Sequence, residues 1–513
     1  MPMDPIPVID LFAGPGGMSE GFSSLRDEND EPVFRSIMSI EMERTAHATL
    51  RLRAFARRLM DADGRLPQDY IDYLGTPSSE NLERLKDSHP EEWAAAEAEA
   101  IQGTLKEGDD EFVEMAKKRL QGYDGPLVLI GGPPCQAYSL VGRARRTHDK
   151  DRLEKDVKQT LYKCYLRFIE VLRPTAFVME NVKGLLSARN YGEGVFGHIR
   201  ADMEALGYEL HSMVVKDPER PHDFIVRADE FGVPQARHRV ILFGTRSGCG
   251  QGAPGVMTPR PVITVDQVLG EMPRIRSGFS SRVHDKLDWK EYVRKAAEKL
   301  MLTPEGSALG PSLEPVMEGK HLPSAQHADG IGAEDRNPLS DWYRGHLAGS
   351  GVLPEHVARN HMDSDLDRYL FCAAYAQEHK TCAKLYDFPK YLLPNHKNAE
   401  GAVEGKEVVF ADRFHVQLSD QPSTTVTSHI SKDGHYFIHP DPSQCRSLTV
   451  REAARLQTFP DDYFFMGNRT DRTSLSIGSF DMPSTVNPRE RRRARLSRKS
   501  QASVVHPGVI AAG

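Results

Sequence analysis

Short apolar segments that alternate with helical stretches constrain the fold of this chain more than any other feature. They lie at residues 8–12, 34–40, 127–130, 176–179 and 239–244, and each is followed by small or polar residues. Apolar runs of this length are typical of buried strands, and the helices between them predict parallel crossovers. We therefore expect an α/β fold with a doubly wound, mostly parallel sheet, whose functional residues gather at the carboxyl ends of the strands.

The chain divides into three parts by composition. Residues 1–246 carry the strands, with a helical insertion at about 42–125 that is rich in Ala, Glu, Arg and Leu. From residue 247 glycine, proline and histidine become frequent, and periodicity returns only at a predicted helix within 448–459. Residues 247–465 are therefore expected to form a second, smaller and irregular domain. Residues 466–513 are polar and then Arg-rich, and we expect most of this tail to be disordered.

Composition and charge argue against several classes of protein. Six cysteines without a CxxC pair predict neither a disulfide framework nor a zinc site, so we expect no metal and free thiols in a reducing cytoplasm. No apolar run is long enough to span a bilayer, and the N-terminus lacks the pattern of a secretory signal. The net charge of −7 disfavours an extended nucleic-acid footprint. Local clusters at Arg143, Arg145 and Arg146 and at residues 489–499 are either such a footprint or a solvated surface.

A glycine-rich turn follows the first predicted strand. Gly14, Gly16 and Gly17 would let a ligand approach the backbone at the start of a helix, where amide groups point outward. Glu41 ends the second strand, where a carboxylate can accept hydrogen bonds from ribose hydroxyls. The dinucleotide pattern GxGxxG fails because Ser19 occupies its third glycine position. The turn therefore binds another nucleoside cofactor or is an ordinary tight turn.

One cysteine stands in an unusual loop. Cys135 belongs to the sequence Gly-Pro-Pro-Cys-Gln at residues 132–136, which directly follows the third predicted strand. A free cysteine is most often a small buried hydrophobe. Here arginines follow, and a positive environment lowers the pKa of a thiol and increases its thiolate fraction. These surroundings favour a nucleophile over a structural cysteine.

Polar side chains also mark the next two predicted strands. Glu180 and Asn181 end the fourth strand and are expected beside Cys135 at the same edge of the sheet. The carboxyl group of Glu180 either caps a helix or pairs with an arginine, or it holds a proton near a ring nitrogen. Arg237 and Arg239 alternate at the start of the fifth strand. They are either surface charges or point to one face and share a phosphate or a carbonyl oxygen.

In their order along the chain, these segments resemble the motifs of the cytosine-C5 DNA methyltransferases of bacterial restriction-modification systems. The matching segments are residues 10–22 (the cofactor motif), 132–136 with Ser139 (the catalytic loop), 180–182 (ENV), 235–239 (QxRxR) and 448–460 (RExARLQxFP). Residues 424–426 resemble the threonine-containing segment near the end of the family's target-recognition region. The resemblance implies the S-adenosylmethionine-dependent methyltransferase fold for the first domain and target recognition for the second.

The resemblance also implies what the catalytic residues do. The target cytosine is flipped out of duplex DNA, Cys135 attacks its C6 atom, and C5 then accepts a methyl group. Glu180 contacts the N3 edge of the base, and Arg239, with Arg237 beside it, contacts the O2 edge. The loop that closes over DNA carries Gln136, Ser139, Arg143 and Arg145.

The cofactor implied by the resemblance is S-adenosyl-L-methionine. Phe12 would stack on its adenine, and Gly14 and Gly16 would lie at its methionine end. Glu41 would bind the ribose.

The chain departs from the family's pattern at two places. The stretch at 42–125 is long, and it leaves Asp109 and Asp124 as candidates for the aspartate that contacts the adenine. The C-terminus lacks a GNAVPP segment, and residues 474–486 lead into an arginine run instead. Without that segment one wall of the cofactor site would be missing. We then expect weak cofactor binding and weak or absent activity, unless a second chain supplies the element.

Four functions remain open from the sequence. The first is an active DNA methyltransferase, which we expect to be a cytoplasmic monomer acting on duplex DNA. A cognate restriction endonuclease would belong to the same system without contacting it. The second is a tRNA cytosine-C5 methyltransferase; the length of residues 247–440 favours DNA, because sequence readout needs surface. The third is a DNA-binding relic without turnover, and a nicotinamide dehydrogenase, opposed by Ser19, is the fourth.

Overall fold

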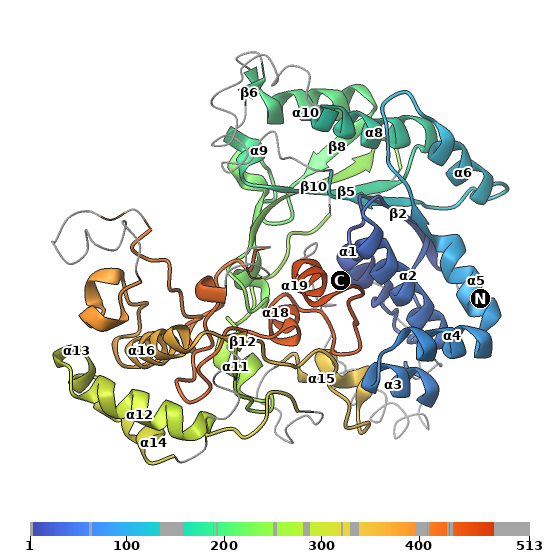
Figure 1. Cartoon of the computed structure of the whole chain (residues 1–513). Coiled ribbons are helices and arrows are strands. Elements are labelled where there is room, and N and C mark those ends of the chain that lie inside the picture. The colour runs from blue at the N-terminus through green and yellow to red at the C-terminus, as the bar shows by residue number, and fades with distance from the viewer. Residues whose placement is uncertain are drawn as a thin grey trace, which may run out of the picture.

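The chain folds into a sheet-containing part and a mainly helical part, which lie at the upper right and lower left of the computed structural model (Figure 1). The structure describes residues 4–60, 64–133, 157–187, 189–190, 193–249, 254–280, 288–319, 322–328, 338–394, 408, 410–427, 430 and 434–476. Among the helices of these ranges, none has the length and apolar character that a membrane crossing requires.

An eight-stranded sheet forms the centre of the first part, in the order β3-β2-β1-β4-β5-β10-β8 with β9 paired to β10. The strands are β1 Ile6–Leu11, β2 Phe34–Glu41, β3 Ala100–Gln102, β4 Val128–Gly131, β5 Ala176–Val182, β8 Tyr208–His211, β9 Ile225–Arg227 and β10 His238–Arg246. Neighbours from β3 to β5 are parallel, and β10 is antiparallel to β5, β8 and β9. The predicted mostly parallel α/β sheet is confirmed. Because the strand order reverses between β1 and β4, the topology favours a binding crevice at their carboxyl ends.

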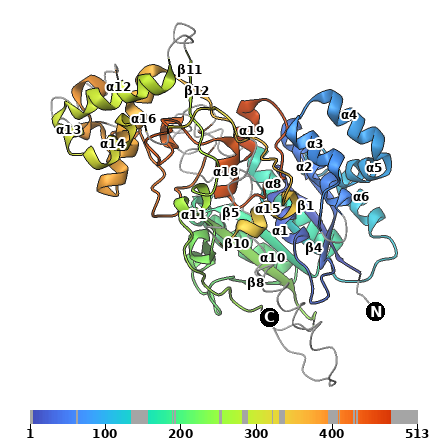
Figure 2. The same ribbon diagram turned by 90° about the horizontal axis from the view of Figure 1, so that it is seen from below.

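Helices cover both faces of this sheet (Figures 1 and 2). They are α1 Gly17–Ser23, α2 Arg44–Leu59, α6 Glu111–Arg119, α8 Val157–Leu172, α9 Gly184–Ser187 and α10 Val195–Ala205, and the short strands β6 Arg189–Asn190 and β7 Glu193–Gly194 precede α10. Ile9 and Leu129 join the apolar cluster of α6, α8 and α10, whereas Val8 and Ile130 face Met18 of α1. Successive strand residues thus point to opposite faces, which explains why the strands are apolar throughout.

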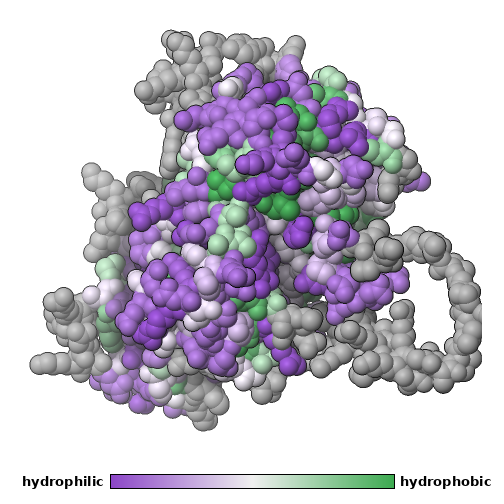
Figure 3. Space-filling model, turned by 90° about the vertical axis from the view of Figure 1, so that its right-hand side faces the viewer, coloured by the Kyte–Doolittle hydropathy of each residue, from purple (hydrophilic) through white to green (hydrophobic). Residues whose placement is uncertain are grey.

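The insertion between β2 and β4 is helical, as predicted, except for the short strand β3. Its additional helices are α3 Gln68–Gly75, α4 Ser79–Ser88 and α5 Pro90–Glu99. They pack on α2 through aromatic side chains, with ring centroids 5.2 Å apart for Phe55 and Trp93. Tyr73 of α3 lies 5.9 Å from the ring of Phe464, so the insertion also contacts the C-terminal motif. The side of the molecule that carries α4 and α5 is mostly hydrophilic (Figure 3).

Residues 247–440 contain several helices within a largely irregular region. The region contains α11 Val265–Leu269, α12 Trp289–Met301, α13 Pro304–Ser307, α14 Gly310–Met317, α15 Ser340–Arg344 and α16 Asp363–His379, with β11 Gly278–Phe279 paired to β12 Asn360–His361. Trp289, Val293, Ala297 and Leu300 of α12 enter one buried cluster with α14 and α16. These four residues have helical spacing. The glycines and prolines on either side of α12 make the region look irregular when only its composition is considered. The region also contains the short 3-10 turns η5 Gly345–Leu347, η6 Leu385–Asp387, η7 Lys390–Leu392 and η9 Gly434–Tyr436. Two further 3-10 turns, η2 Pro221–Phe224 and η3 Ala228–Phe231, precede it.

The beginning of the tail, residues 466–476, is ordered. The helix predicted within 448–459 is present as α18 Val450–Leu456, and a further helix, α19 Arg469–Leu475, follows it. Asn468 caps α19 by accepting a hydrogen bond from the Asp471 amide. The Met466 amide donates to Thr49 Oγ1 at 2.9 Å, which ties this segment to α2. Residues 477–513 lie outside the described part, so disorder there stays a prediction.

Acid is expected to destabilise the helical part through a buried histidine. His356 is 1% exposed, and its imidazole bonds the Pro273 carbonyl at 2.8 Å. Burial lowers the pKa of His356 to about 4. The unfolded chain takes up this proton first, so the stability that neutral His356 contributes is complete above about pH 6.5 and is lost as the pH falls toward about 4, a change of about 3 kcal/mol.

Urea unfolding between about pH 7 and pH 4.5 measures this loss. His356→Gln keeps a hydrogen-bonding side chain but cannot be protonated, so its midpoint should depend less on pH. Equal pH dependence in the two proteins would exclude His356 as the source.

Candidate active site

The glycine-rich turn after β1 has a backbone that few side chains allow. Phe12, Gly14 and Gly16 have φ angles of 59°, 58° and 102°. A Cβ on Gly16 would lie 2.8 Å from Leu50 Cδ1 and 3.0 Å from the Tyr463 hydroxyl oxygen. Glycine is therefore required at position 16 by both conformation and space.

Glu41 at the end of β2 closes this turn from the neighbouring strand. Its Oε2 accepts a hydrogen bond from the Gly14 amide at 2.9 Å, and its Oε1 accepts one from the Glu43 amide at 2.7 Å. Burial raises the pKa of Glu41, and these amide donors act against that rise. The Glu41 carboxylate thus lies between the carboxyl ends of β1 and β2.

A buried carboxyl group beneath the turn was not predicted. Asp10 of β1 is fully buried and accepts a hydrogen bond from the Ser19 hydroxyl at 2.6 Å. Burial raises the pKa of Asp10 to about 7. Its second carboxylate oxygen has no hydrogen-bond partner in the described part of the chain. Ser19, which breaks the dinucleotide pattern, therefore holds Asp10 beside the turn.

Glu180 and Arg239 form an ion pair across the antiparallel strands β5 and β10. Arg239 Nε donates to Glu180 Oε1 at 2.6 Å, and the side chains are 14% and 12% exposed. Glu180 Oε2 lies 3.2 Å from where a Cβ on Gly132 would be. Asn181 Nδ2 donates to the Pro133 carbonyl at 3.2 Å. The pair therefore stands directly beside the start of the 132–136 segment.

Arg237 lies next to this pair. Burial and the charge of Arg239 lower the pKa of Arg237 to about 9, and Glu180 acts in the opposite direction. Arg237 therefore lies close to both members of the pair. That Arg237 and Arg239 share a ligand stays a prediction.

The threonine-containing segment of the second part lies against the QxRxR segment. The Ala236 amide donates to the Ser423 carbonyl at 2.8 Å, and Thr425 Oγ1 donates to the Ala236 carbonyl at 2.8 Å. Gln235 reaches the carbonyl of Leu456 in α18 at 3.4 Å. Segments from three distant parts of the sequence thus meet beside Glu180 and Arg239.

The C-terminal motif supports the glycine turn. The Tyr463 hydroxyl donates to the Pro15 carbonyl at 2.5 Å. Arg53 of α2 forms buried ion pairs with both Glu20 of α1 and Asp462. Asp462 and Tyr463 therefore support the turn and the helix α1 that follows it.

Several predicted site residues lie outside the described residues: Cys135, Gln136, Ser139, Arg143 and Arg145. Asp124 precedes β4, and its charge acts on Tyr123 together with that of Asp4. It therefore lies at the amino end of the sheet, opposite the glycine turn. Asp109 precedes α6, where its carboxylate accepts a hydrogen bond from the Glu111 amide at 3.1 Å.

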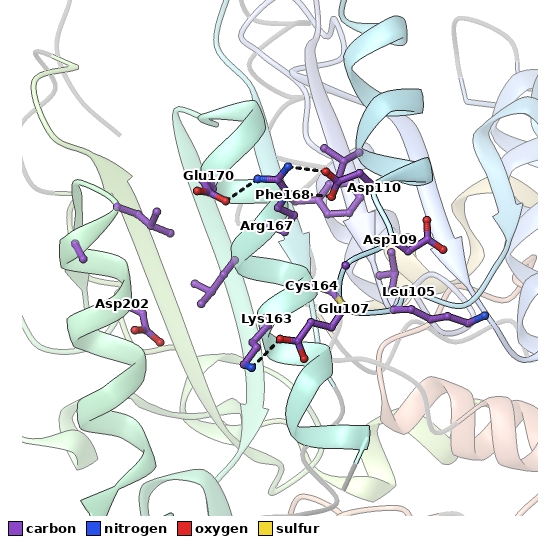
Figure 4. Close-up of a pocket in the computed structure, with 16 residues that line it drawn as sticks. Leu105, Glu107, Asp109, Asp110, Lys163, Cys164, Arg167, Phe168, Glu170 and Asp202 are labelled. Carbon is purple, nitrogen blue, oxygen red and sulfur yellow. Dashed lines mark hydrogen bonds and ion pairs between the residues drawn. The ribbon is translucent and has the colours of Figure 1, made fainter. Parts of the chain in front are cut away.

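A cavity of about 570 Å³ lies elsewhere, along α8 (Figure 4). Four of its charged side chains form two ion pairs: Lys163 with Glu107 at 2.7 Å, and Arg167 with Asp110 at 2.5 Å. No residue of the glycine turn and neither member of the Glu180–Arg239 pair lines it. No group of three or more His, Cys, Asp or Glu in the described ranges could hold a metal ion. We take as the candidate active site the strand ends where Glu41, Glu180 and Arg239 lie.

Comparisons with known proteins identify the family of the chain. The family model of C-5 cytosine-specific DNA methylases matches residues 88–312 and 352–479. Type II methyltransferase M.Bpa9945I of Bacillus paralicheniformis is 32% identical over 483 residues, which cover 90% of this chain and 93% of that protein. Type II methyltransferase M.AgeI of Thalassovita gelatinovora is 26% identical over 481 residues, covering 90% and 93%.

Among solved structures, a protein described as a DNA modification methyltransferase encoded within an E. coli prophage covers 93% of this chain and 95% of its own at 17% identity. Its TM-score of 0.46 is too low to add to the assignment of the fold. The family model and the curated relatives carry the assignment: the chain belongs to the family of C-5 cytosine-specific DNA methylases.

Proposed function

We propose that this chain transfers a methyl group from S-adenosyl-L-methionine to C5 of a cytosine flipped out of duplex DNA, through a covalent bond between Cys135 and C6. One observation carries the proposal: the Glu180–Arg239 pair stands beside Gly132, at the crevice that the glycine turn and Glu41 also border. The Glu180 carboxyl group, the Arg239 guanidinium and the glycine turn thus lie together where the 132–136 segment begins.

The turn fits the proposed cofactor. Gly14 and Gly16 keep the backbone open, and Phe12 has a positive φ, which ends the extended strand at the turn. The Glu41 carboxylate, already ordered by two amide donors, can accept further hydrogen bonds from ribose hydroxyls. When bound, S-adenosylmethionine supplies an electrophilic methyl group.

The protein's own residues would activate the base. The Cys135 thiolate forms a bond from its sulfur to C6, and the electrons of the C5–C6 double bond move toward C5. Glu180 hydrogen-bonds or protonates N3, which stabilises the negative charge that would otherwise collect on the ring. Arg239, with Arg237 behind it, offers its guanidinium to O2. After C5 is methylated, a base removes the C5 proton, the double bond re-forms, and the thiolate leaves.

The surroundings of the site support duplex DNA as substrate. Residues 423–425 bring the second part of the chain against the QxRxR segment, so a base in the crevice would have the helical region beside it. The relatives are named type II methyltransferases. We extend the proposal to a cytoplasmic monomer that shares its target sequence with a restriction endonuclease and does not contact that enzyme.

Replacing Glu41 with alanine should weaken cofactor binding by about 1–3 kcal/mol, because charge-assisted hydrogen bonds to the ribose are lost. Calorimetric titration with S-adenosylhomocysteine measures the change. Glu43→Ala is the matched control, since Glu43 caps α2 through the amides of Thr45 and Ala46. It should cost stability but not affinity. Equal affinity of Glu41→Ala and the unmodified protein would remove Glu41 from the site.

Methyl incorporation tests the proposed function. Unmethylated genomic DNA and tRNA are each incubated with the full-length protein and labelled S-adenosylmethionine, and the product nucleosides are separated. We expect label in 5-methylcytosine from DNA, and bisulfite sequencing then gives the recognised site. Label in tRNA alone would contradict the proposal, as would duplex binding without any incorporation, which is the result expected of a relic.

A further inference from the structure

Two arginines outside the active site, Arg359 and Arg469, lie close to each other, and in the described part of the chain neither has an acidic partner. Arg469 of α19 donates to the carbonyls of Val357 at 3.0 Å and Ala358 at 3.4 Å, the two residues before Arg359. Arg359 itself donates to the carbonyl of Ile430 at 3.4 Å. Among the described residues, both guanidinium groups therefore bond only to neutral carbonyls.

No carboxylate of the described residues forms an ion pair with either arginine. The acidic residues close to them in sequence are engaged elsewhere: Asp471 accepts the Asn468 amide, and Glu355 pairs with Arg451 at 2.9 Å. Partial burial, and then the like charge of Arg359, lower the pKa of Arg469 to about 10. An anion bound between the two arginines would stabilise both positive charges. Arg469 is exposed, so an anion can reach the pair from solvent.

The pair is connected to the candidate active site. Ile430, which Arg359 contacts, lies five residues after Thr425, and Thr425 bonds the Ala236 carbonyl beside Arg237. Arg359 therefore contacts a residue that is close in sequence to the segment packed against residues 235–239.

We propose that Arg359 and Arg469 together bind a phosphate of the DNA backbone, a step that rests on the proposed function. Guanidinium forks match phosphate oxygens in geometry and charge. Phosphate contacts orient a protein on the duplex without reading its sequence. The pair thus orients the protein on the duplex, and it contributes equally to the binding of every DNA sequence.

The salt dependence of DNA binding tests this site. Fluorescence anisotropy with a labelled duplex is measured on the full-length protein from about 50 to 200 mM salt. For the double variant Arg359→Gln and Arg469→Gln, the slope of log K against log salt should become shallower by about 0.9, the value for one phosphate. The loss of affinity should then be about threefold larger at ~50 mM than at ~200 mM salt.

Two further variants separate charge from structure. Arg359→Lys with Arg469→Lys keeps both charges and should keep the slope. Arg84→Gln with Arg200→Gln is the matched control, because these exposed arginines pair with Glu80 and Glu204 at i,i+4. If the first Gln variant unfolds early, Arg359→Gln alone should still give a shallower slope, since the side chain of Arg359 makes one long hydrogen bond within the described part of the chain.

An unchanged slope in a folded Gln variant would overturn the phosphate site. Failure of the unmodified protein to bind duplex DNA at any salt concentration, or binding of tRNA alone, would instead contradict the proposed function.

Discussion

Replacing Arg53 with methionine is expected to lower the free energy of unfolding by about 3–5 kcal/mol, the cost of breaking a buried ion pair by removing one partner. The Arg53 side chain is 2% exposed, and its partners Glu20 and Asp462 are 4% and 0% exposed. Burial alone would raise the pKa of Asp462, but Arg53 and His346 hold that pKa well below its ordinary value. Methionine leaves Asp462 with only His346 at 3.1 Å.

The same helix offers a matched control. Arg51 pairs with Glu97, and the two side chains are 29% and 48% exposed, so Arg51→Met should change the stability by less than about 1 kcal/mol. Urea unfolding followed by circular dichroism gives the midpoints and slopes of both variants. Equal midpoints for Arg53→Met and Arg51→Met would show that the buried network contributes no more than a surface pair.

Most of the sheet could be predicted because its strands are buried on both faces. Residues such as Val8 and Ile9 pack on opposite helix layers, so the strand reads as a continuous apolar run. The direction of β10 could not be predicted, since periodicity reports burial and not orientation. The sequence does not predict β3, because its three residues continue a stretch rich in alanine and glutamate. For α12, glycines and prolines on either side hid a regular apolar stripe.

The candidate site could be predicted where its functional side chains lie at the ends of strands. Glu41, Glu180 and Arg239 lie at the ends of β2, β5 and β10, and parallel topology alone brings the first two to one edge. Contacts that depend on distant sequence could not be predicted. The pair of Arg53 and Asp462 spans 409 residues, and no local pattern identifies one from the other.

The order of residues 466–476 also depended on tertiary contacts. Their composition is polar, which favours disorder. Yet Met466 is held by Thr49, and Arg472 lies 4.8 Å from the ring centroid of Phe464. These contacts stabilise a segment whose own sequence gives little reason for order, and they bring Arg469 to Arg359.

Cys135→Ser is expected to abolish methyl transfer, by more than about 10⁴-fold, while duplex binding persists. Serine has a similar size, but its hydroxyl is far less acidic than a thiol, so almost no anion is present to attack C6. A duplex with 5-fluorocytosine at the target should trap the unmodified protein as a covalent adduct, because its C5 has no proton to lose. The Cys135→Ser variant should give no adduct. Near-normal turnover by this variant would refute the nucleophile assignment.

Glu180→Gln separates activation of the base from attack by the thiolate. Glutamine fits beside Arg239 and can still bond the base, but it cannot hold or deliver a proton at N3. Methyl transfer should fall by about 10²–10⁴-fold, the range for a lost acid-base group, and the 5-fluorocytosine adduct should form slowly rather than fail to form. Glu209→Gln is the control, because Glu209 is an exposed glutamate on β8 of the same sheet. If both variants turn over alike, Glu180 serves only to pair with Arg239, and the proton at N3 must come from another group.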